Sequence, residues 1–338
     1  MRTSLAELLE TGRVLLADGA TGTNYFQMGL ESGEPPEFWN VDHPDRVKSL
    51  HQRFVDAGAD IILTNTFGCN RSRLKLHNAQ DRTFELAKRA AELAREVADA
   101  STRPVVVAGS VGPTGELFEP LGLLTDESAT AMFEEQIAGL KAGGADVAWI
   151  ETMSAAEEVR AAANGAIRAG LAFTATCSFD TAGRTMMGIM PDQLYTMFEG
   201  LSQPPLAMGS NCGVGASDIL VSLLAMTADN AKGRFIVKGN CGIPQFHGTE
   251  IHYSGTPELM AVYAALAVHA GARIVGGCCG TSPDHLAAMR RALDSTIFDA
   301  SKRPTQESIV AAIGPLANQA PTINTSERTR RRGRSSAE

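Results

Sequence analysis

The sequence predicts a (β/α)8 barrel, the TIM-barrel architecture, from three observations. The 338-residue chain is 44% hydrophobic and 20% charged, so it can bury a full-sized core. Eight short aliphatic runs recur along it, with helical segments between them. Most of the runs are apolar at successive positions, which is typical of parallel strands covered on both faces. A doubly wound sheet is the competing fold, but residues 18–23 lack the GxGxxG spacing that such a fold usually carries after its first strand.

Each predicted strand is a β-branched or aliphatic run bounded by glycine or polar turn residues. Residues 14–18 read Val-Leu-Leu-Ala-Asp, and residues 61–65 read Ile-Ile-Leu-Thr-Asn. Later runs of the same kind lie at residues 105–109, 147–151, 173–177, 206–211, 235–239 and 273–277. Eight strands that alternate with helices over about 300 residues fit one barrel, whose usual size is about 250 residues with room for insertions.

Four segments between the runs predict helices. Residues 44–57 and 257–270 open with proline, which is favoured at the first helical position. Each carries an apolar stripe at helical spacing. The stripes are Val47, Leu50, Phe54 and Val55 in the first segment, and Leu259, Val262, Tyr263 and Leu266 in the second. Residues 126–142 and 154–169 begin with Asp126 and Ser154, which favour the N-cap position.

Composition and charge exclude several classes of protein. Thirty Lys and Arg against 38 Asp and Glu give a net charge of -8, which disfavours a nucleic-acid-binding surface and favours a small-molecule partner. No stretch approaches about 20 uninterrupted apolar residues, so we expect no membrane span. The first residues lack the apolar core of a secretory signal, which predicts a cytoplasmic protein. A homo-oligomer is compatible with these features, which do not decide the oligomeric state.

The chain is predicted to form one barrel domain, residues 1–320, followed by a polar tail. From Pro321 onward there is no periodicity, and five arginines crowd between positions 328 and 334. We expect residues 321–338 to be a disordered basic tail. Docking to an anionic partner is the functional alternative.

The residues that close the predicted strands are rich in chemically active groups. In a (β/α)8 barrel the active site lies at the C-terminal ends of the strands and in the loops that follow. Carboxylates, amides and thiols stand there in this chain: Asp18, Asn65, Glu151, Asn211, Cys212, Asn240, Cys241, Cys278 and Cys279. These groups are therefore expected to converge on one rim of the barrel.

The cysteines at this rim predict a metal site. A long chain with a good core needs no disulfides, so special cysteines point to metal binding or catalysis. Cys278 and Cys279 are adjacent and flanked by glycines that let the backbone turn sharply, so both can ligate one metal. Cys212 is the candidate third ligand, and Cys241 is its rival. Three thiolates favour Zn²⁺, and an open fourth position is typical of catalysis.

Six motifs at the strand ends carry a family resemblance. They are Asp-Gly-Ala-Thr-Gly-Thr at 18–23, Thr-Asn-Thr-Phe at 64–67, Ala-Gly-Ser-Val-Gly-Pro at 108–113, Glu-Thr at 151–152, Gly-Ser-Asn-Cys at 209–212 and Gly-Gly-Cys-Cys-Gly at 276–280. Over about residues 10–295 the chain resembles the zinc-dependent homocysteine S-methyltransferase family. The segment 33–44, with Phe-Trp-Asn and Asp-His-Pro, looks most like bacterial betaine-homocysteine S-methyltransferases.

The resemblance implies how the metal and the acceptor meet. Zn²⁺ would be held by Cys212, Cys278 and Cys279, the same three thiols that the strand-end pattern indicates. The sulphur of L-homocysteine would take the open position and would itself be the nucleophile. No further catalytic residue is then expected, because the thiol loses its proton on binding.

The resemblance also implies how the rest of homocysteine is bound. Asp18 and Glu151 would engage its amino group, and backbone N–H groups of Gly19, Ala20 and Thr21 would receive its carboxylate. The chemistry is suitable, because an ammonium pairs with carboxylates and a carboxylate is bound by a nest of amides.

The implied donor is a small onium compound, with glycine betaine as the first choice, and the products would be methionine and dimethylglycine. Aromatic faces bind quaternary ammonium groups. The aromatic candidates follow the first two predicted strands and are Tyr25, Phe38, Trp39 and Phe67. The chain departs from animal betaine enzymes at Gly68 and Thr152, where those enzymes have tyrosines. Alternative donors are S-methylmethionine, another sulfonium compound and a methyl-corrinoid protein.

Two hypotheses from other classes compete with methyl transfer. A non-catalytic zinc- or thiol-binding barrel has no need for Asp18 and Glu151 beside the open metal position. A phosphate-binding barrel would use residues 239–242 and 276–280 as a cradle. Two cysteines in the second of these loops make it a poor phosphate cradle.

Overall fold

The core is one sheet of eight parallel strands in the order β1-β10-β7-β6-β5-β4-β3-β2. The computed structural model describes residues 2–228, 233–242, 244–247 and 250–317. The strands are β1 Leu15–Leu16, β2 Ile61–Leu63, β3 Val106–Val111, β4 Val147–Met153, β5 Phe173–Cys177, β6 Met208–Cys212, β7 Phe235–Gly239 and β10 Ala272–Gly277. A bridge between Ala17 and Ile61 joins the first strand to the last, so the sheet closes. The predicted (β/α)8 barrel is confirmed, and each predicted strand coincides with one of these eight.

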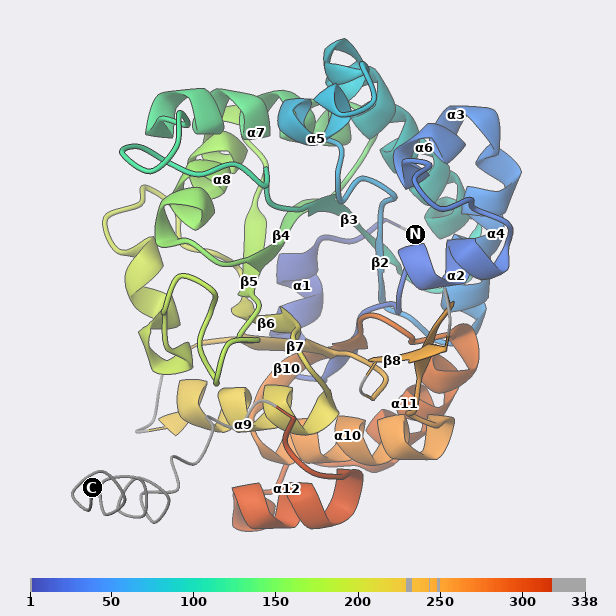
Figure 1. The fold of residues 1–338 in the computed structure, drawn as a ribbon. Coiled ribbons are helices and arrows are strands. Elements are labelled where there is room, and N and C mark those ends of the chain that lie inside the picture. Colours follow the sequence, from blue (N-terminus) through green and yellow to red (C-terminus); the bar gives the residue numbers. More distant parts are fainter. Residues whose placement is uncertain (1, 229–232, 243, 248–249, 318–338) are drawn as a thin grey trace, which may run out of the picture.

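Helices surround the strands and alternate with them (Figure 1). They are α2 Gly22–Gln27, α3 Trp39–Asp42, α4 Pro44–Asp56, α5 Arg71–Lys75, α6 Thr83–Ala100, α7 Asp126–Ala142, α8 Ala156–Ala169, α9 Ala216–Met226, α10 Pro257–His269, α11 Pro283–Ser295 and α12 Gln306–Ile313. The connection from β5 to β6 carries a 3-10 helix, Pro191–Phe198, at the place of an α-helix.

Helix α4 buries the stripe that its sequence predicts, but α10 does not. Val262 of α10 is 41% exposed. The buried side chains of α10 are Met260, Tyr263, Ala264, Ala267 and Val268. Because α10 is apolar on most sides, its periodicity does not reveal which face packs on the barrel.

The starts of α7 and α8 also differ from the prediction. Thr125, one residue before Asp126, is the N-cap of α7, and its side chain accepts a hydrogen bond from the Ser128 N–H. Helix α8 begins at Ala156 after Ala155, which provides no side-chain cap. Ser154 therefore lies outside the helix that it was expected to cap.

Apolar side chains fill the N-terminal half of the barrel interior. The strands contribute Leu15, Ala17, Ile61, Leu63, Val106, Ala108, Val147, Trp149, Ile236 and Ile274. An additional helix, α1 Leu5–Glu10, packs Leu5, Leu8 and Leu9 into the same cluster. In Figure 1 this helix is visible through the ring of strands, and it closes the bottom of the barrel.

The interior changes character toward the C-terminal ends of the strands. Side chains on a strand alternate between its two faces, so residues two positions beyond the apolar layer point into the barrel as well. These positions are polar and buried: Ser110, Glu151 and Lys238. The barrel therefore has an apolar floor below a polar layer, and this layer supports the rim where the predicted site lies.

One described segment departs from the alternation of strands and helices. After β7 the chain forms an antiparallel hairpin, β8 Pro244–His247 and β9 Glu250–Tyr253, which the sequence did not predict. The expected basic tail, residues 321–338, lies outside the described residues. No helix in the described part of the chain combines the length and the hydropathy needed to cross a bilayer.

Candidate active site

Three thiols meet at the C-terminal rim of the barrel. The Sγ atoms of Cys212, Cys278 and Cys279 all lie within 4.8 Å of one another. Cys212 ends β6, while Cys278 and Cys279 follow β10, and only β7 separates these two strands in the sheet (Figure 1). The three cysteines named by the sequence are thus brought together, and we call them the thiol trio.

Cys212 is held by an unusual backbone and by the residue before it. Its φ of 60° lies in the left-handed region, which non-glycine residues seldom adopt unless their surroundings enforce it. The Asn211 side chain accepts hydrogen bonds from the Thr152 N–H at 2.8 Å and from Thr176 Oγ1 at 2.6 Å. These bonds tie β6 to β4 and β5 directly beneath Cys212, and so fix where its sulphur points.

Asn240, which follows β7, links the two cysteine-bearing turns. Its Oδ1 accepts a hydrogen bond from the Cys279 N–H at 3.0 Å, and its Nδ2 donates to the Gly213 carbonyl at 2.9 Å. The Cys278 N–H donates to the Gly239 carbonyl at 2.8 Å. The relative positions of the three sulphurs therefore depend on a strand that supplies none of them.

Cys241 does not belong to the trio, although the sequence left it as a rival ligand. It is fully buried, and its Sγ lies 2.7 Å from where a Cβ on Gly255 would stand. Its sulphur therefore packs against the segment that follows β9. The group that could hold a metal within the described residues comprises Cys212, Cys278 and Cys279.

The donor set fits Zn²⁺. Hydrogen bonding with Cys212, together with burial, raises the pKa of Cys279 to about 12, and hydrogen bonding with Cys278 raises the pKa of Cys212. The thiols thus share protons at short range, and a divalent cation would displace these protons and neutralise the thiolates. Three soft protein ligands are the kind of set that catalytic zinc uses, with the fourth position taken by water or substrate.

Asp18 lies below the trio in a buried ion pair. Its Oδ1 is 2.8 Å from the Lys238 Nζ, and its Oδ2 accepts a hydrogen bond from the Leu63 N–H at 2.7 Å. Burial acts to lower the pKa of Lys238, but the carboxylates of Asp18 and Glu151 outweigh burial and raise it. The ammonium of Lys238 therefore stays charged beside the Asp18 carboxylate.

Glu151, on β4, is the second of these carboxylates. It is 8% exposed, and its Oε1 accepts a hydrogen bond from Ser110 Oγ at 2.5 Å. Burial raises the pKa of Glu151, while Lys238 and the Ser110 hydroxyl oppose this rise. Asp18 and Glu151 thus lie in one electrostatic cluster with Lys238, as a pocket for an ammonium group requires.

The backbone after β1 is only partly available for a carboxylate. The Ala20 N–H donates to the Thr281 carbonyl at 3.1 Å, so this predicted contact is already used. A Cβ on Gly19 would lie 2.5 Å from the same carbonyl, which explains the glycine. Of the three predicted N–H groups, the one on Ala20 is therefore engaged within the fold.

The structure does not gather the four predicted donor-binding aromatics. Tyr25 is 0% and Trp39 is 1% exposed, and their ring centroids lie 5.2 Å apart in the core. Phe38 is half-buried against the same core. Phe67 is 42% exposed and stands after β2. The expectation that Trp39 and Tyr25 offer faces to a donor is corrected, because those faces are used in packing.

A family model described as homocysteine S-methyltransferase matches residues 15–293. The chain belongs to this family. Methionine synthases of Mycobacterium leprae (strain TN) and Mycobacterium tuberculosis (strain ATCC 25618 / H37Rv) are 31% and 30% identical to it over 97% and 98% of its length. The chain spans 29% of the length of each of these relatives.

Solved structures show the same fold. The metallated form of the Escherichia coli homocysteine methyltransferase MmuM superposes with a TM-score of 0.71 and 22% identity, over 84% of this chain and 98% of that one. Its apo form gives a TM-score of 0.66 and 23% identity, over 84% and 98% of the two chains. At this level of sequence identity, the structural similarity shows a shared barrel fold and nothing more specific.

The two positions where this family member lacks a tyrosine have other partners. The Gly68 N–H donates to Glu37 Oε1 at 2.6 Å, and a Cβ at this position would lie 3.0 Å from that oxygen. Thr152 holds Asn211, as described above. Glu37 thus occupies the space beside Gly68 that a larger side chain would need.

A different tyrosine stands at the thiol trio. Tyr253 ends the β8–β9 hairpin, and its hydroxyl shares a hydrogen bond with the Cys279 thiol. Its ring lies so close to Gly280 that a Cβ there would be 2.3 Å from Cγ of the tyrosine. Tyr253 could not be recognised from its sequence context, because the hairpin itself was not predicted. Asn240 was recognisable as a polar strand end, and Lys238 was hidden within an apolar run.

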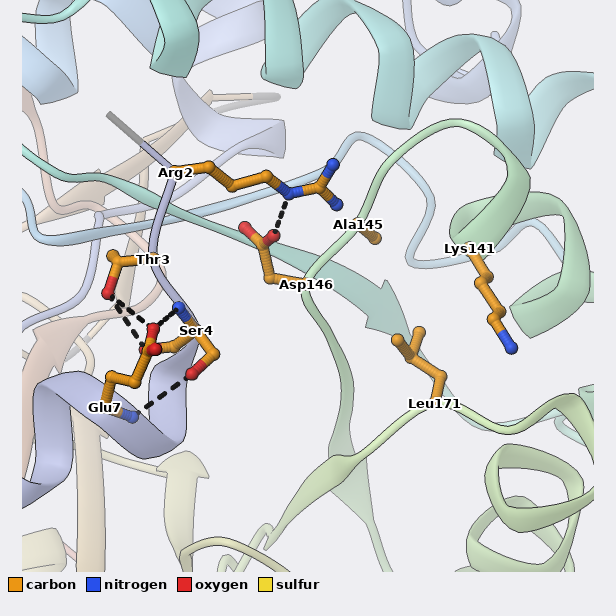
Figure 2. Close-up of a pocket in the computed structure, with 8 residues that line it drawn as sticks. All are labelled: Arg2, Thr3, Ser4, Glu7, Lys141, Ala145, Asp146 and Leu171. Carbon is orange, nitrogen blue, oxygen red and sulfur yellow. Dashed lines mark hydrogen bonds and ion pairs between the residues drawn. The ribbon is translucent and has the colours of Figure 1, made fainter.

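One hollow lies far from this chemistry. Figure 2 shows a pocket of about 480 Å³ at the N-terminal end of the barrel, where α1 meets the segment before β4. Asp146 within it is already paired with Arg2 at 3.1 Å, and the Glu7 carboxylate caps the Ser4 N–H at 2.8 Å. Its charged groups are therefore engaged in holding α1 and β4 together.

Proposed function

We propose that this chain transfers a methyl group from a small onium donor, glycine betaine in the first instance, to the thiolate of L-homocysteine in a zinc-dependent reaction. The products are methionine and, with this donor, dimethylglycine. The observation that carries the proposal is the thiol trio at the C-terminal rim of a barrel whose strand ends also carry the buried carboxylates of Asp18 and Glu151. Family membership supports homocysteine as the acceptor.

The chain provides the metal ligands and their fixed geometry. Cys212, Cys278 and Cys279 would hold Zn²⁺, with Asn211 and Asn240 keeping their turns in place. When bound, Zn²⁺ supplies a Lewis acid that keeps the sulphur of homocysteine deprotonated and nucleophilic at neutral pH. Three anionic protein sulphurs favour an electron-rich substrate sulphur, because together they already outweigh the charge of the dication.

The polar layer orients the amino-acid part of homocysteine. Glu151 uses Oε1 for the Ser110 hydroxyl, so we assign its Oε2, together with Asp18, to the ammonium. The N–H groups of Gly19 and Thr21 receive the carboxylate. Binding at these two ends fixes the sulphur relative to the donor, which converts an encounter of two molecules into a reaction within one complex.

The transfer is a single displacement at carbon. The homocysteine sulphur forms a bond to the methyl carbon, the bond from that carbon to the onium nitrogen breaks, and its electron pair stays on nitrogen. The quaternary ammonium of the donor becomes a neutral tertiary amine, and the demethylated donor leaves. Methionine leaves as a weakly bound thioether. The proton of the thiol departs to solvent when homocysteine binds, so no general base is assigned.

An aromatic side chain after β2 is assigned to the donor. Phe67 stands after β2 and is exposed, so it is the aromatic face left for an onium group. Its ring lies 2.7 Å from where a Cβ on Gly112 would be, which places it between the loops after β2 and β3. S-Methylmethionine, another sulfonium compound and a methyl-corrinoid protein are the alternative donors.

The experiment is methionine formation from homocysteine by purified, zinc-loaded, thiol-reduced protein. Glycine betaine and S-methylmethionine are supplied separately, and Cys279→Ala is measured beside the unmodified chain. Turnover with betaine that disappears in Cys279→Ala supports both the metal site and the donor. Turnover with S-methylmethionine but not with betaine would identify S-methylmethionine as the donor. Absence of turnover with either small molecule, with homocysteine bound, points to another sulfonium compound or a methyl-corrinoid protein as the donor.

A second experiment separates the enzyme from a non-catalytic zinc barrel. Glu151→Gln should keep about one zinc per chain, because Glu151 is not a metal ligand. It should lower the affinity for homocysteine about 100-fold, because the substitution removes a charged hydrogen-bond acceptor for the substrate ammonium. Zinc analysis and calorimetry with homocysteine measure the two properties. Loss of zinc and homocysteine together would show that Glu151 supports the metal site and not the substrate.

A further inference from the structure

We propose that Lys238 is a positioning residue that sets the charge of the homocysteine amino-group pocket, so that the pocket selects thiols carrying one ammonium group. The inference rests on the proposed function, in which Asp18 and Glu151 receive that ammonium. The methyl displacement itself makes no use of this lysine. Its place in the structure therefore calls for a separate explanation.

Lys238 is buried inside the barrel, where a lysine is rare without a partner. It is 2% exposed and lies on β7 two residues after Ile236, which belongs to the apolar floor. Strand alternation therefore points both side chains into the barrel. Lys238 therefore lies in the polar layer that also contains Glu151, next to the apolar side chains of the barrel interior.

The surroundings hold the lysine in one place. Its Nζ is 2.8 Å from Asp18 Oδ1 and 5.8 Å from the centroid of the Trp149 ring. Gly276, its register partner on β10, leaves the room that its chain needs, because a Cβ there would lie 2.9 Å from Lys238 Cγ. Residues of three other chain segments thus hold the ammonium of Lys238 in place.

The net charge of the cluster formed by Asp18, Glu151 and Lys238 matches a ligand with one positive charge. Burial raises the pKa of both Asp18 and Glu151, and the charge of Lys238 opposes this rise in each. With both carboxyls ionised, they contribute two negative charges and Lys238 one positive charge, so the cluster carries one surplus negative charge. The ammonium of homocysteine brings that sum to zero. A buried cluster with uncompensated charge is costly, so the cluster favours a ligand that supplies this one charge.

Removal of the lysine changes what the ligand meets. Two buried carboxylates without a shared cation repel each other, and one of them takes up a proton. The ligand ammonium then pairs with one carboxylate where it had two. The advantage of homocysteine over a thiol without an amino group should therefore shrink.

The test compares L-homocysteine with 4-sulfanylbutanoate, the same thiol acid without the amino group. Calorimetry on zinc-loaded protein should show homocysteine binding about 100-fold more tightly to the unmodified chain. In Lys238→Met this ratio should fall at least about tenfold, through weaker homocysteine binding, with zinc content unchanged. Lys141→Met, at the other end of the barrel, is the matched control and should keep the ratio.

Lys238→Gln decides between charge and shape. Glutamine can still donate a hydrogen bond to Asp18 but carries no charge. If the methionine variant does not fold, the same measurement can be made on the glutamine variant. We expect it to behave as Lys238→Met does. A glutamine variant with the ratio of the unmodified chain would overturn the inference. Equal binding of the two thiols by the unmodified chain would instead overturn the proposed amino-group pocket itself.

Discussion

Cys212 is the residue on which the metal site depends most, because it is the one thiol of the trio that comes from a different strand. Cys212→Ala should lower bound zinc from about one to below about 0.1 per chain after dialysis, since two thiolates with no third anchor bind the metal weakly. Cys177→Ala is the matched control, because Cys177 is buried in β5 outside the trio. Zinc retained in Cys212→Ala, or lost in both variants, would contradict the assignment.

His51 of α4 gives a prediction for the pH dependence of folding. It is 2% exposed, and burial lowers its pKa to about 4, whereas in an unfolded chain it is about 6.5. Between these values the unfolded chain binds more protons, so stability is present above about pH 6.5 and falls toward pH 4.

The His51 effect can be isolated by difference. Urea denaturation at pH 7.5 and pH 4.5 should show a loss on the order of 3 kcal/mol that His51→Gln lacks, and the difference between the two chains cancels other titrating groups. The same pH slope in both chains would show that His51 is not kept neutral by burial.

At the scale of single residues, the sequence predicted the side chains whose chemistry is visible in their type. The thiols and the two carboxylates were found because each stands at a strand end. Trp39 was misjudged, since a tryptophan in a loop-rich segment looks the same whether it faces a ligand or packs on Tyr25. Lys238 was missed because its importance depends on which face of β7 points inward.

Among the elements, β6 and β7 approach each other so closely that only glycine fits at one position. A Cβ on Gly209 would lie 1.9 Å from the Ile236 carbonyl oxygen. Gly209→Ala should therefore destabilise the protein by about 1–3 kcal/mol or more, because one strand must move away from the other. Thermal and urea unfolding measure this cost.

Gly22→Ala is the matched control for that substitution. Gly22 begins α2, and a Cβ there meets no heavy atom within 4 Å. This variant should be neutral or stabilised by up to about 1 kcal/mol. Equal stability of the two alanine variants would mean that the strand spacing is looser than the structure has it.

The sequence predicted those elements that repeat a strong local pattern. The eight strands were located because parallel strands covered on both faces have continuous apolar runs. The β8–β9 hairpin and the 3-10 helix before β6 escaped, because short polar segments carry little periodicity. The face of α10 was misplaced, since an almost uniformly apolar helix has no distinctive stripe.

Over the whole molecule, the two ends of the barrel have different tasks. Opposite the thiol trio, buried Asp60 accepts hydrogen bonds from Arg13 at 2.8 Å, Arg290 at 3.2 Å and the Leu16 N–H at 2.9 Å. These contacts join the start of β1 and helix α11 to the start of β2, where the barrel closes. The contacts at this end therefore serve stability, whereas the proposed chemistry lies at the other end.

Asp60→Asn should therefore separate stability from function. We expect a loss of about 3 kcal/mol in the free energy of unfolding, at the lower end for a broken buried pair because Arg13 is 45% exposed. Zinc content and homocysteine affinity should stay unchanged below the unfolding temperature. A loss of zinc in folded Asp60→Asn would show that the two ends are coupled. Nothing in the sequence predicted this cluster, because it joins segments far apart in the chain.

X-ray absorption at the zinc edge, with and without homocysteine, tests whether the thiol trio holds the metal and leaves one position to the substrate. We expect three sulphur neighbours at about 2.3 Å in the protein alone and four after homocysteine is added. A count of three sulphurs that does not rise with homocysteine, or fewer than three at the outset, would contradict the claim that the trio presents zinc to the substrate sulphur.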